Sequence, residues 1–418
     1  MTPMNGRRVV ITGCGAVTPI GTGKDEFWSA LERGENGVDY IKSFDTTNHP
    51  VKIAAEVKDF APEKWLDKKE VRRTDRVIQL AAAAADLAIK DSGLDLEKVD
   101  KNMLGVYLGS GEGGIRTLED NARVINTKGP NRVSPFMVPM MIANMPAAYI
   151  AIRCGAKGPN MSVVTACASS IHSMGEAYYC VMRGDADIMI TGGSEAAVTP
   201  LATAGFSSLK ALSSRNDDPK HASRPFDADR DGFIIGEGAG VLIFEEYEHA
   251  KARGAHIYAE VVGYGLSCDA HHITAPDPEG DGAYRAMAMA VKRAGWKPED
   301  IDLINAHGTS TPLNEKMETL AIKRLMGEEG AKKVLVQATK SMIGHALGAA
   351  GSLGTIAALL AIDKGIVHPT INQFTPDPAC DLNTVPNKAI KAEVNRAIIN
   401  SFGFGGHNGV LAIQSCRD

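Results

Sequence analysis

Paired cysteines, long apolar runs and an excess of basic charge are all missing from this chain. The seven cysteines are an odd number, widely spaced over 418 residues, and no two of them form a Cys-x-x-Cys pair. This spacing argues against a disulfide framework or a structural zinc site and predicts a reducing compartment. The net charge of −5 gives no overall electrostatic case for binding nucleic acid.

The apolar segments are short, so we expect no membrane association. The longest, around residues 356–362, is expected to be far too short to span a bilayer. The start, MTPMNGRRVVITG, has two arginines but no long apolar run behind them, and we do not expect it to be a secretory signal. We therefore expect a soluble protein of the cytoplasm, or of an organelle after removal of a targeting segment. Its 44% hydrophobic residues suit one large core or two medium ones.

Two glycine-rich segments near the start begin like nucleotide-binding motifs. VVITGCGAV opens like a dinucleotide fingerprint, but Thr18 stands where the third glycine is required. GTGKD resembles a phosphate loop, but the first glycine is missing and Asp25 replaces the required Ser or Thr. Both departures argue against a nucleotide-binding protein.

The chain repeats one plan twice, and we expect the two halves to be residues 1–254 and 255–418. Each half has a strand with a glycine turn, a second strand, a strand–turn–helix unit and a closing glycine-rich hairpin. The corresponding segments are RRVVITGCGAVTPIG and IYAEVVGYGLSCDA, MLGVYLGSGEGG and DLINAHGTSTP, NMSVVTACASSIHSMG and VLVQATKSMIGHALGAAG, and GEGAGVLIFEE and GFGGHNGVLAIQ. This alternation predicts an α/β architecture with mainly parallel sheets, in which two similar halves pack as a pseudo-dimer.

Three segments have the composition of helices. RVIQLAAAAADLAIKDSGL is rich in alanine and should stop at Gly93, and AYRAMAMAVKRAGW should stop at Gly295. GHALGAAGSLGTIAALLAI is rich in glycine, which suits close packing against another backbone. We expect this third helix to lie at the centre of the molecule.

The segment VVTACASSIHSMGEAYY predicts a strand at 161–164, a tight turn and a helix, with Cys167 at the turn. Small neighbours leave room for a substrate to reach its sulfur. The positive end of a helix dipole lowers a thiol pKa, so we expect Cys167 to be available as a thiolate at neutral pH. Taken alone, Cys167 would be interpreted as a buried structural cysteine, since free cysteines are usually small buried hydrophobic residues.

Three later segments carry further chemically active residues at predicted strand ends or glycine turns. NAHGTSTPLN contains His307, TKSMIGHALGAAG contains Lys340 and His345, and NSFGFGGHNG contains Phe402 and Phe404. Each residue alone is weak support for a site. Because each half supplies a strand end, the two imidazoles and the lysine could converge on Cys167.

The motifs TACASS, AHGTSTP, TKSMxGH and SFGFGGxN stand in order along the chain, together with SRPFDADRDGFIIGEGAGVLIFEE from Ser223. In these motifs, and over essentially its whole length, the sequence resembles the condensing enzymes of the thiolase superfamily. The resemblance is strongest to the elongating β-ketoacyl-[acyl-carrier-protein] synthases of type II. It implies a thiolase-like fold, in which duplicated αβαβα halves form a five-layer sandwich with two central sheets. It also implies a homodimer.

The resemblance implies a decarboxylative condensation with malonyl-[acyl-carrier-protein]. Cys167 would carry the acyl group as a thioester, with the backbone N–H groups of Cys167 and Phe404 as the oxyanion hole. His307 and His345 would hydrogen-bond the malonyl thioester oxygen and stabilise the enolate left by loss of CO₂. Lys340, paired with Glu318, would support the site electrostatically. The reaction implies no metal or organic cofactor, since phosphopantetheine arrives on the carrier protein.

Binding roles follow from the same resemblance. Thr309 and Thr311, and more weakly Thr274, would hold the phosphopantetheine arm by its amides. Phe404 would move as a gate when the acyl chain enters, with Phe402 beside it as a substrate contact. An acidic carrier protein requires a basic docking surface, for which this chain offers several lysines and arginines. The alternative is that these residues form only a solvated helix face. The candidate docking residues are Lys69, Arg72, Arg73, Arg76, Arg132 and Lys210.

One residue departs from the family pattern. Type II relatives carry isoleucine in the GSGxGG loop, at the end of the acyl pocket, where this chain has Glu112. A buried carboxylate in an apolar tunnel is costly unless it is paired or protonated, so the preferred chain length is an open question. Met137, in SPFMVP, is a second departure from the family pattern, and it gives weaker support to an altered chain-length preference.

Related classes fit less well. A degradative thiolase would carry a second cysteine in GFGGHNG, an initiating synthase would have asparagine in place of His345, and a non-catalytic partner subunit would lack Cys167. The alternative that stays open is a discrete ketosynthase of a specialised polyketide or polyene pathway.

Overall fold

The computed structural model describes residues 6–416, so the first five residues of the segment predicted not to be a signal lie outside it. Eleven strands form one sheet. Ten of them make up two five-stranded parts, and the eleventh, β2 (Gly21–Thr22), pairs with the last two residues of β1. The first part contains, in spatial order, β6 (Asn160–Val163), β5 (Leu104–Gly109), β7 (Ile188–Glu195), β8 (Gly238–Glu246) and β1 (Val9–Thr18). The second contains β9 (Ala259–Cys268), β15 (His407–Gln414), β14 (Arg396–Gly403), β10 (Leu303–Asn305) and β11 (Leu335–Gln337).

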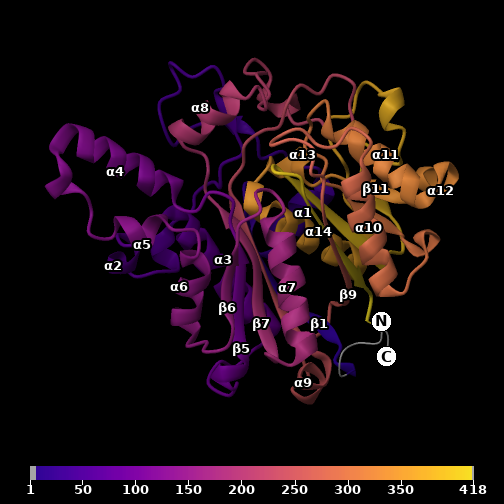
Figure 1. Cartoon of the computed structure of the whole chain (residues 1–418), viewed down its shortest axis with the longest axis horizontal. Helices are drawn as coiled ribbons and strands as arrows, with labels where there is room; N and C mark the ends of the chain where they lie inside the picture. Colours follow the sequence, from indigo (N-terminus) through magenta and orange to yellow (C-terminus); the bar gives the residue numbers. More distant parts are fainter. Residues whose placement is uncertain (1–5, 417–418) are drawn as a thin grey trace.

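The two parts have equivalent strand orders and meet at β1 and β9. The predicted duplication is therefore visible in the pairing, but the two central sheets are hydrogen-bonded into one. The junction is short, because only Val9, Val10 and Ile11 of β1 pair with β9. Beyond it the parts diverge and leave room for helices between them (Figure 1).

The sheet is mixed, and the prediction of mainly parallel sheets was wrong. β5 and β10 pair in parallel with both of their neighbours, whereas all pairings of β1, β8, β9 and β15 are antiparallel. The reason lies in the closing segment of each half, which returns the chain in the opposite direction. In the second half this segment is the predicted hairpin of β14 and β15. In the first half, β8 pairs with β7 only after an excursion through residues 196–237.

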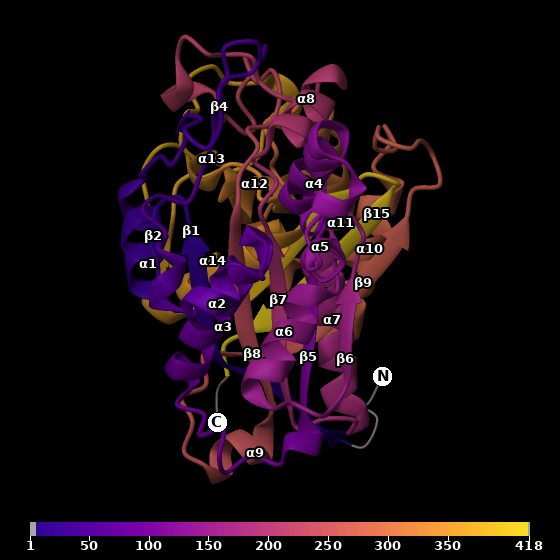
Figure 2. The same cartoon turned by 90° about the vertical axis from the view of Figure 1, so that its left-hand side faces the viewer.

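Helices form three layers around the two sheet parts, as predicted for a five-layer sandwich (Figures 1 and 2). Two helices lie between the parts, two cover the outer face of the first and two cover the outer face of the second. In that order they are α7 (Ser169–Arg183) and α14 (Ala350–Lys364), α3 (Arg76–Ser92) and α6 (Met145–Cys154), and α10 (Asp281–Ala294) and α11 (Asn314–Met326).

Shorter elements lie around this frame. The remaining helices are α1 (Lys24–Arg33), α2 (Lys68–Val71), α4 (Ile115–Lys128), α5 (Met137–Met141), α8 (Pro200–Ser208), α9 (Tyr247–Ala252), α12 (Glu328–Lys333) and α13 (Lys340–Ile343). Two small antiparallel pairs are β3 (Asp39–Tyr40) with β4 (Ile53–Ala54), and β12 (Ile366–Val367) with β13 (Ile390–Lys391).

The three predicted helices are confirmed. Asp75 caps the start of α3 through the backbone N–H of Val77, and Gly93 ends the helix with φ 62°, a conformation that favours glycine. Gly295 ends α10 in the same way, with φ 71°. The glycines of α14 permit the close packing predicted for it, since a Cβ on Gly351 would come within 2.5 Å of Ile171 in α7.

The expectation that every apolar segment is too short to span a membrane needs correction. The helical segment Leu347–Lys364 is long and apolar enough to cross a membrane by length and composition alone. In the protein, 83% of this segment is buried, because it fills the space between the two sheet parts. Its apolar character is therefore accounted for by the core.

The close packing of strand β9 against helix α10 can be tested by its effect on the free energy of unfolding. A Cβ on Gly265 would come within 1.9 Å of the Ala286 carbonyl oxygen, so Gly265→Ala should lower the free energy of unfolding by about 2–3 kcal/mol. Gly205→Ala is the matched control, because that Cβ meets no atom within 4 Å and alanine favours helix α8. Urea unfolding followed by circular dichroism measures both variants. Equal midpoints for the two would contradict the packing described.

Candidate active site

Cys167 lies at the turn between β6 and α7, as the sequence predicts. Its side chain is buried, and Ala166 before it has φ 51°, which bends the chain sharply into the helix. The second half of the chain holds this turn in place, because Ser401 Oγ of β14 donates to the Cys167 carbonyl oxygen at 2.7 Å. The nucleophile of one half is thus positioned by a strand of the other.

His345 is the nearest ionisable partner of Cys167. Its Nε2 lies 3.1 Å from the Cys167 sulfur. The His345 backbone is fixed by the first half of the chain, since its N–H donates to Ile234 and its carbonyl accepts from Gly236. The ring of His307 lies edge-on to that of His345, with 5.4 Å between centroids. The predicted convergence of the two histidines on Cys167 is therefore present in the structure.

Lys340 and Glu318 both hold the backbone around His307, but not as the ion pair the resemblance implies. Lys340 Nζ donates to the His307 carbonyl oxygen. Glu318 accepts from the N–H groups of His307 and Gly308, at 2.8 and 2.9 Å, and from Asn400 at 3.0 Å. No direct ion pair joins Lys340 Nζ to the Glu318 carboxylate in the described part of the chain, but the Glu318 charge still acts on Lys340 and opposes the lowering of its pKa by burial.

Burial controls the protonation of these groups. It raises the pKa of the Cys167 thiol to about 12, although the Lys340 charge acts in the opposite direction. This direction is opposite to the lowering expected from the helix dipole, because loss of solvent around the sulfur favours the protonated thiol. Burial, followed by the Lys340 charge, also holds the pKa values of His307 and His345 well below the ordinary range. The pKa of Lys340 falls to about 8 for the same reason, burial.

A cavity of about 640 Å³ opens above Cys167 and contains most of the predicted contacts. It is lined by Cys167, both histidines, Thr274, Thr309, Thr311, Phe402, Phe404, Glu112 and Lys210. Thr309 and Thr311 hydrogen-bond each other at 3.0 Å through their hydroxyl oxygens. The further lining residues that the sequence analysis missed include Phe206, Leu209, Leu313 and Asn314. The first two lie in residues 196–222, a stretch in which the sequence analysis singled out only Lys210.

The turn that carries Phe404 packs directly against the start of α7. A Cβ on Gly403 would come within 3.1 Å of the Cys167 backbone nitrogen. This proximity is compatible with the predicted oxyanion hole from the N–H groups of Cys167 and Phe404, which stays a prediction.

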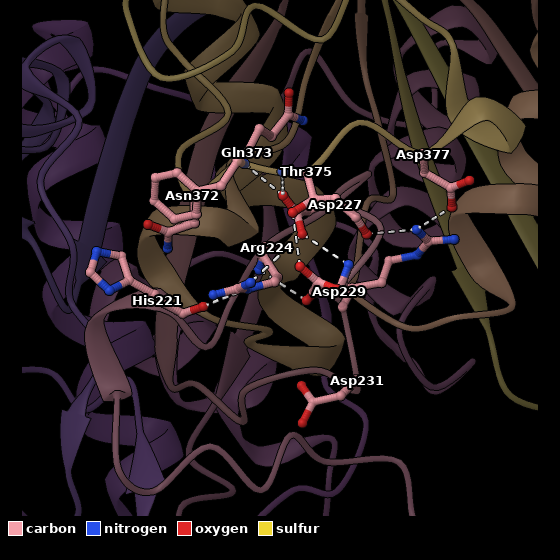
Figure 3. Close-up of polar contacts among 12 residues, drawn as sticks. His221, Arg224, Asp227, Asp229, Asp231, Asn372, Gln373, Thr375 and Asp377 are labelled. Atoms are coloured by element: carbon pink, nitrogen blue, oxygen red, sulfur yellow. Dashed lines mark hydrogen bonds and ion pairs between the residues drawn. The ribbon is translucent and has the colours of Figure 1, made fainter.

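Arg230 supports the loop that carries Thr309 and Thr311, and it is hydrogen-bonded to Asp227 and Asp377. These two aspartates are labelled in Figure 3. Its buried guanidinium donates to the carbonyl oxygens of Thr311 and Pro312, at 3.1 and 3.3 Å. It also donates to Asp377 and to the Asp227 carbonyl oxygen, both at 2.7 Å. The motif SRPFDADRDGF thus contributes the frame of the cavity.

Glu315 completes this support. Its carboxylate lies 3.3 Å from Arg230 and accepts from the Ser310 N–H at 2.6 Å. Ser310 has φ 72°, a conformation that costs energy for a residue other than glycine. The contact with Glu315 therefore holds a strained turn, and the turn sets the positions of Thr309 and Thr311.

Glu195 is a buried carboxylate that the sequence analysis missed. It stands at the end of β7 and accepts from Ser110 Oγ and from the N–H groups of Gly111, Glu112 and Gly348. It therefore ties the GSGxGG loop to the segment after His345. A lone glutamate directly after the apolar strand IMITGGS was the available signal.

The predicted docking cations do not form one continuous surface on a single chain. Lys69, Arg72 and Arg73 are exposed in and after α2. Arg76 is held by a two-fold ion pair with Glu237, at 2.7 and 2.8 Å, and is thus largely committed within the protein.

The other predicted docking residues lie elsewhere on the surface, and one predicted substrate contact lies outside the cavity. Lys210 is exposed at the cavity mouth after α8, and both views place α8 apart from α2 (Figures 1 and 2). Arg132 is exposed beyond α4. Met137 is half-buried in α5 and does not line the cavity around Cys167.

Comparison with known families decides the class of the protein. Residues 6–250 match the family Beta-ketoacyl synthase, N-terminal domain, and residues 258–374 match Beta-ketoacyl synthase, C-terminal domain. The chain belongs to the β-ketoacyl synthase family. This confirms the family and the fold class inferred from the motifs.

Individual relatives of this β-ketoacyl synthase are similar over nearly its whole length. The 3-oxoacyl-[acyl-carrier-protein] synthase 2 of Synechocystis sp. is 51% identical over 414 residues, 99% of each chain. The solved ishigamide ketosynthase/chain length factor is 38% identical, with a TM-score of 0.93 over 98% of this chain and 100% of that chain. The ketosynthase of AntDE:AntF, solved in complex with its acyl-carrier protein, is 34% identical, with a TM-score of 0.91 and the same coverage.

The raised pKa of Cys167 in this β-ketoacyl synthase can be measured by alkylation. The thiolate is the reactive form, so the rate of iodoacetamide labelling at Cys167 should rise about tenfold per pH unit from pH 6 to 9. Mass spectrometry of the peptide that contains Cys167 gives the rate, and Cys167→Ser supplies the blank. A plateau below pH 8 would show instead that the helix dipole outweighs burial.

Proposed function

We propose that this β-ketoacyl synthase elongates acyl chains by decarboxylative condensation, with Cys167 as the acyl carrier. The observation that carries the proposal is the contact of 3.1 Å between the Cys167 sulfur and His345 Nε2, beside His307, at the base of one cavity. A thiol, two neutral imidazoles and two threonines at the cavity wall match the needs of acyl transfer from a pantetheine thioester.

The first step transfers the acyl group. The Cys167 sulfur attacks the acyl-carrier thioester, while its proton passes by way of His345 to the departing pantetheine sulfur. Because the pKa of Cys167 is raised to about 12, attack requires this proton transfer. The N–H groups of Cys167 and Phe404 bind the oxyanion, and Thr309 and Thr311 hold the pantetheine arm.

The second step forms the carbon–carbon bond. The malonyl thioester loses CO₂, and its electron pair passes to the thioester oxygen as an enolate. His307 and His345, both uncharged because their pKa values are lowered, donate hydrogen bonds to that oxygen. The enolate carbon attacks the acyl group on Cys167, which releases 3-oxoacyl-carrier protein and restores the thiol after one proton is taken up. Lys340 keeps His307 in place through its carbonyl oxygen.

We propose an acyl-carrier protein as partner and a homodimer as the working state. Exposed Lys69, Arg72 and Arg73 at α2, with Lys210 at the cavity mouth, supply cations for an acidic carrier. The solved relative AntDE:AntF is a ketosynthase bound to its acyl-carrier protein, which supports this pairing. Strand β6 stands at the edge of the sheet, and Met161 within it and Val164 directly after it are exposed, which suits pairing with a second copy.

We further propose that the enzyme acts in the cytoplasm and needs no metal or organic cofactor, since decarboxylation drives the condensation. Relatives named synthase 2 support a role in fatty acid elongation. Glu112 in the cavity favours the second candidate, a discrete ketosynthase of a specialised polyketide or polyene pathway.

The proposed roles of the histidines separate in a two-step assay. His307→Ala should still form the acyl-enzyme, because His307 does not contact the sulfur, but should lower malonyl decarboxylation by about 100-fold or more. His345→Ala should lower both acylation and decarboxylation. Acyl-enzyme is measured by intact mass, and 3-oxoacyl product by liquid chromatography and mass spectrometry. A Cys167→Ala variant that still makes 3-oxoacyl product would refute the proposal.

A further inference from the structure

Glu112 places a carboxyl group in the cavity that contains Cys167. It follows β5, and Ala166 and Leu347 line the same cavity. Its Oε2 is buried and has no hydrogen-bond partner within residues 6–416. An unpartnered buried carboxyl group is costly, so its retention needs an explanation.

The neighbouring Glu195 does not supply the missing partner. Its two oxygens already accept four hydrogen bonds, from Ser110 Oγ and three backbone N–H groups. Lys340, the buried cation of the active site, donates to the His307 carbonyl oxygen, and no ion pair joins it to Glu112 within residues 6–416. Burial, and then the Glu195 charge, raise the pKa of Glu112 to about 8, so at neutral pH its carboxyl holds a proton that it can donate.

An acceptor for that proton can come from the substrate. Part of the surroundings of Cys167 is apolar, because Val198, Phe233 and Leu347 belong to the same buried cluster as Cys167. These side chains suit the methylene groups of any acyl chain and do not distinguish one chain from another by polarity. Glu112 lines the same cavity and can make this distinction, because its carboxyl group, unlike the histidines and threonines of the cavity, has no role in the proposed function.

We propose that Glu112 determines specificity by donating a hydrogen bond to a keto or hydroxyl oxygen on the acyl chain carried by Cys167. This inference rests on the proposed function, in which Cys167 carries that chain. The enzyme then prefers oxygen-bearing acyl chains to hydrocarbon chains of equal length. The physical basis is that a site built to hydrogen-bond a substrate oxygen is left with an unpaired buried group when the oxygen is missing.

The test compares acyl loading by matched carrier-protein substrates. Octanoyl-carrier protein is compared with three analogues that have a keto group at C3, C5 or C7, which sample successive depths of the cavity. The rate of adduct formation on Cys167 is followed by intact-protein mass. The wild-type protein should load at least one keto analogue about tenfold faster than octanoyl, at saturating carrier protein.

Two variants assign that preference to Glu112. Glu112→Leu should abolish the preference and accelerate octanoyl loading, because the donor is replaced by an apolar group of similar size. Glu112→Gln keeps an N–H donor and should retain a preference for the same keto position. Since it is nearly isosteric, it also serves if the leucine variant does not fold.

Three results would overturn the inference. Faster loading of octanoyl than of every keto analogue by the wild-type protein would contradict it directly. An unchanged keto-to-octanoyl ratio in Glu112→Leu, with only the longest accepted saturated chain altered, would make Glu112 a length limit and no more. The absence of any adduct from any donor would instead refute the proposed function, and the inference with it.

Discussion

Loss of solvent around four ionisable groups is the constraint on which the site depends. Cys167 comes from the first half of the chain, and His307, Lys340 and His345 come from the second. All four are buried where the strand ends of both halves meet. Burial favours the uncharged form of each, so the thiol keeps its proton and the imidazoles stay neutral. The arrangement supplies hydrogen-bond donors and acceptors in a dry cavity, which is where such groups act most strongly on a developing oxyanion.

The same burial explains how the loops of the site are held. Three buried carboxylates accept backbone N–H groups, and each clamps one loop: Glu195 the loop at Gly111, Glu318 the loop at His307, and Glu315 the turn at Ser310. A carboxylate can accept several hydrogen bonds at once, which compensates for its loss of water. The catalytic groups are therefore held by neighbours that do not themselves face the substrate. Glu112 differs from these three because its buried Oε2 has neither a hydrogen bond nor an ion pair within residues 6–416, whereas the corresponding oxygen of Glu315 is paired with Arg230.

Much of this organisation could be predicted from the sequence. The duplicated plan, the helices that end at Gly93 and Gly295, and the convergence of Cys167 with the two histidines follow from strand–turn–helix patterns and from motifs. Local patterns could not show that β8 returns antiparallel, because the direction of a strand depends on the route of the preceding excursion. They also could not show that burial raises the pKa of Cys167, since burial is a property of the assembled halves. The sequence also could not show that the docking cations lie on separate surfaces or that Arg76 pairs with Glu237, because both depend on how distant segments pack together.

The most direct test of the account is the mass of the intact protein before and after mixing with an acyl-carrier protein, followed by addition of malonyl-carrier protein. The account predicts a mass increase equal to one acyl group per chain, located on the peptide that contains Cys167. It further predicts that this increase disappears when malonyl-carrier protein is added, as 3-oxoacyl-carrier protein and CO₂ are released. A protein mass that does not increase with any acyl donor, or an adduct on another residue, would contradict the assignment of Cys167 as the carrier of the growing chain.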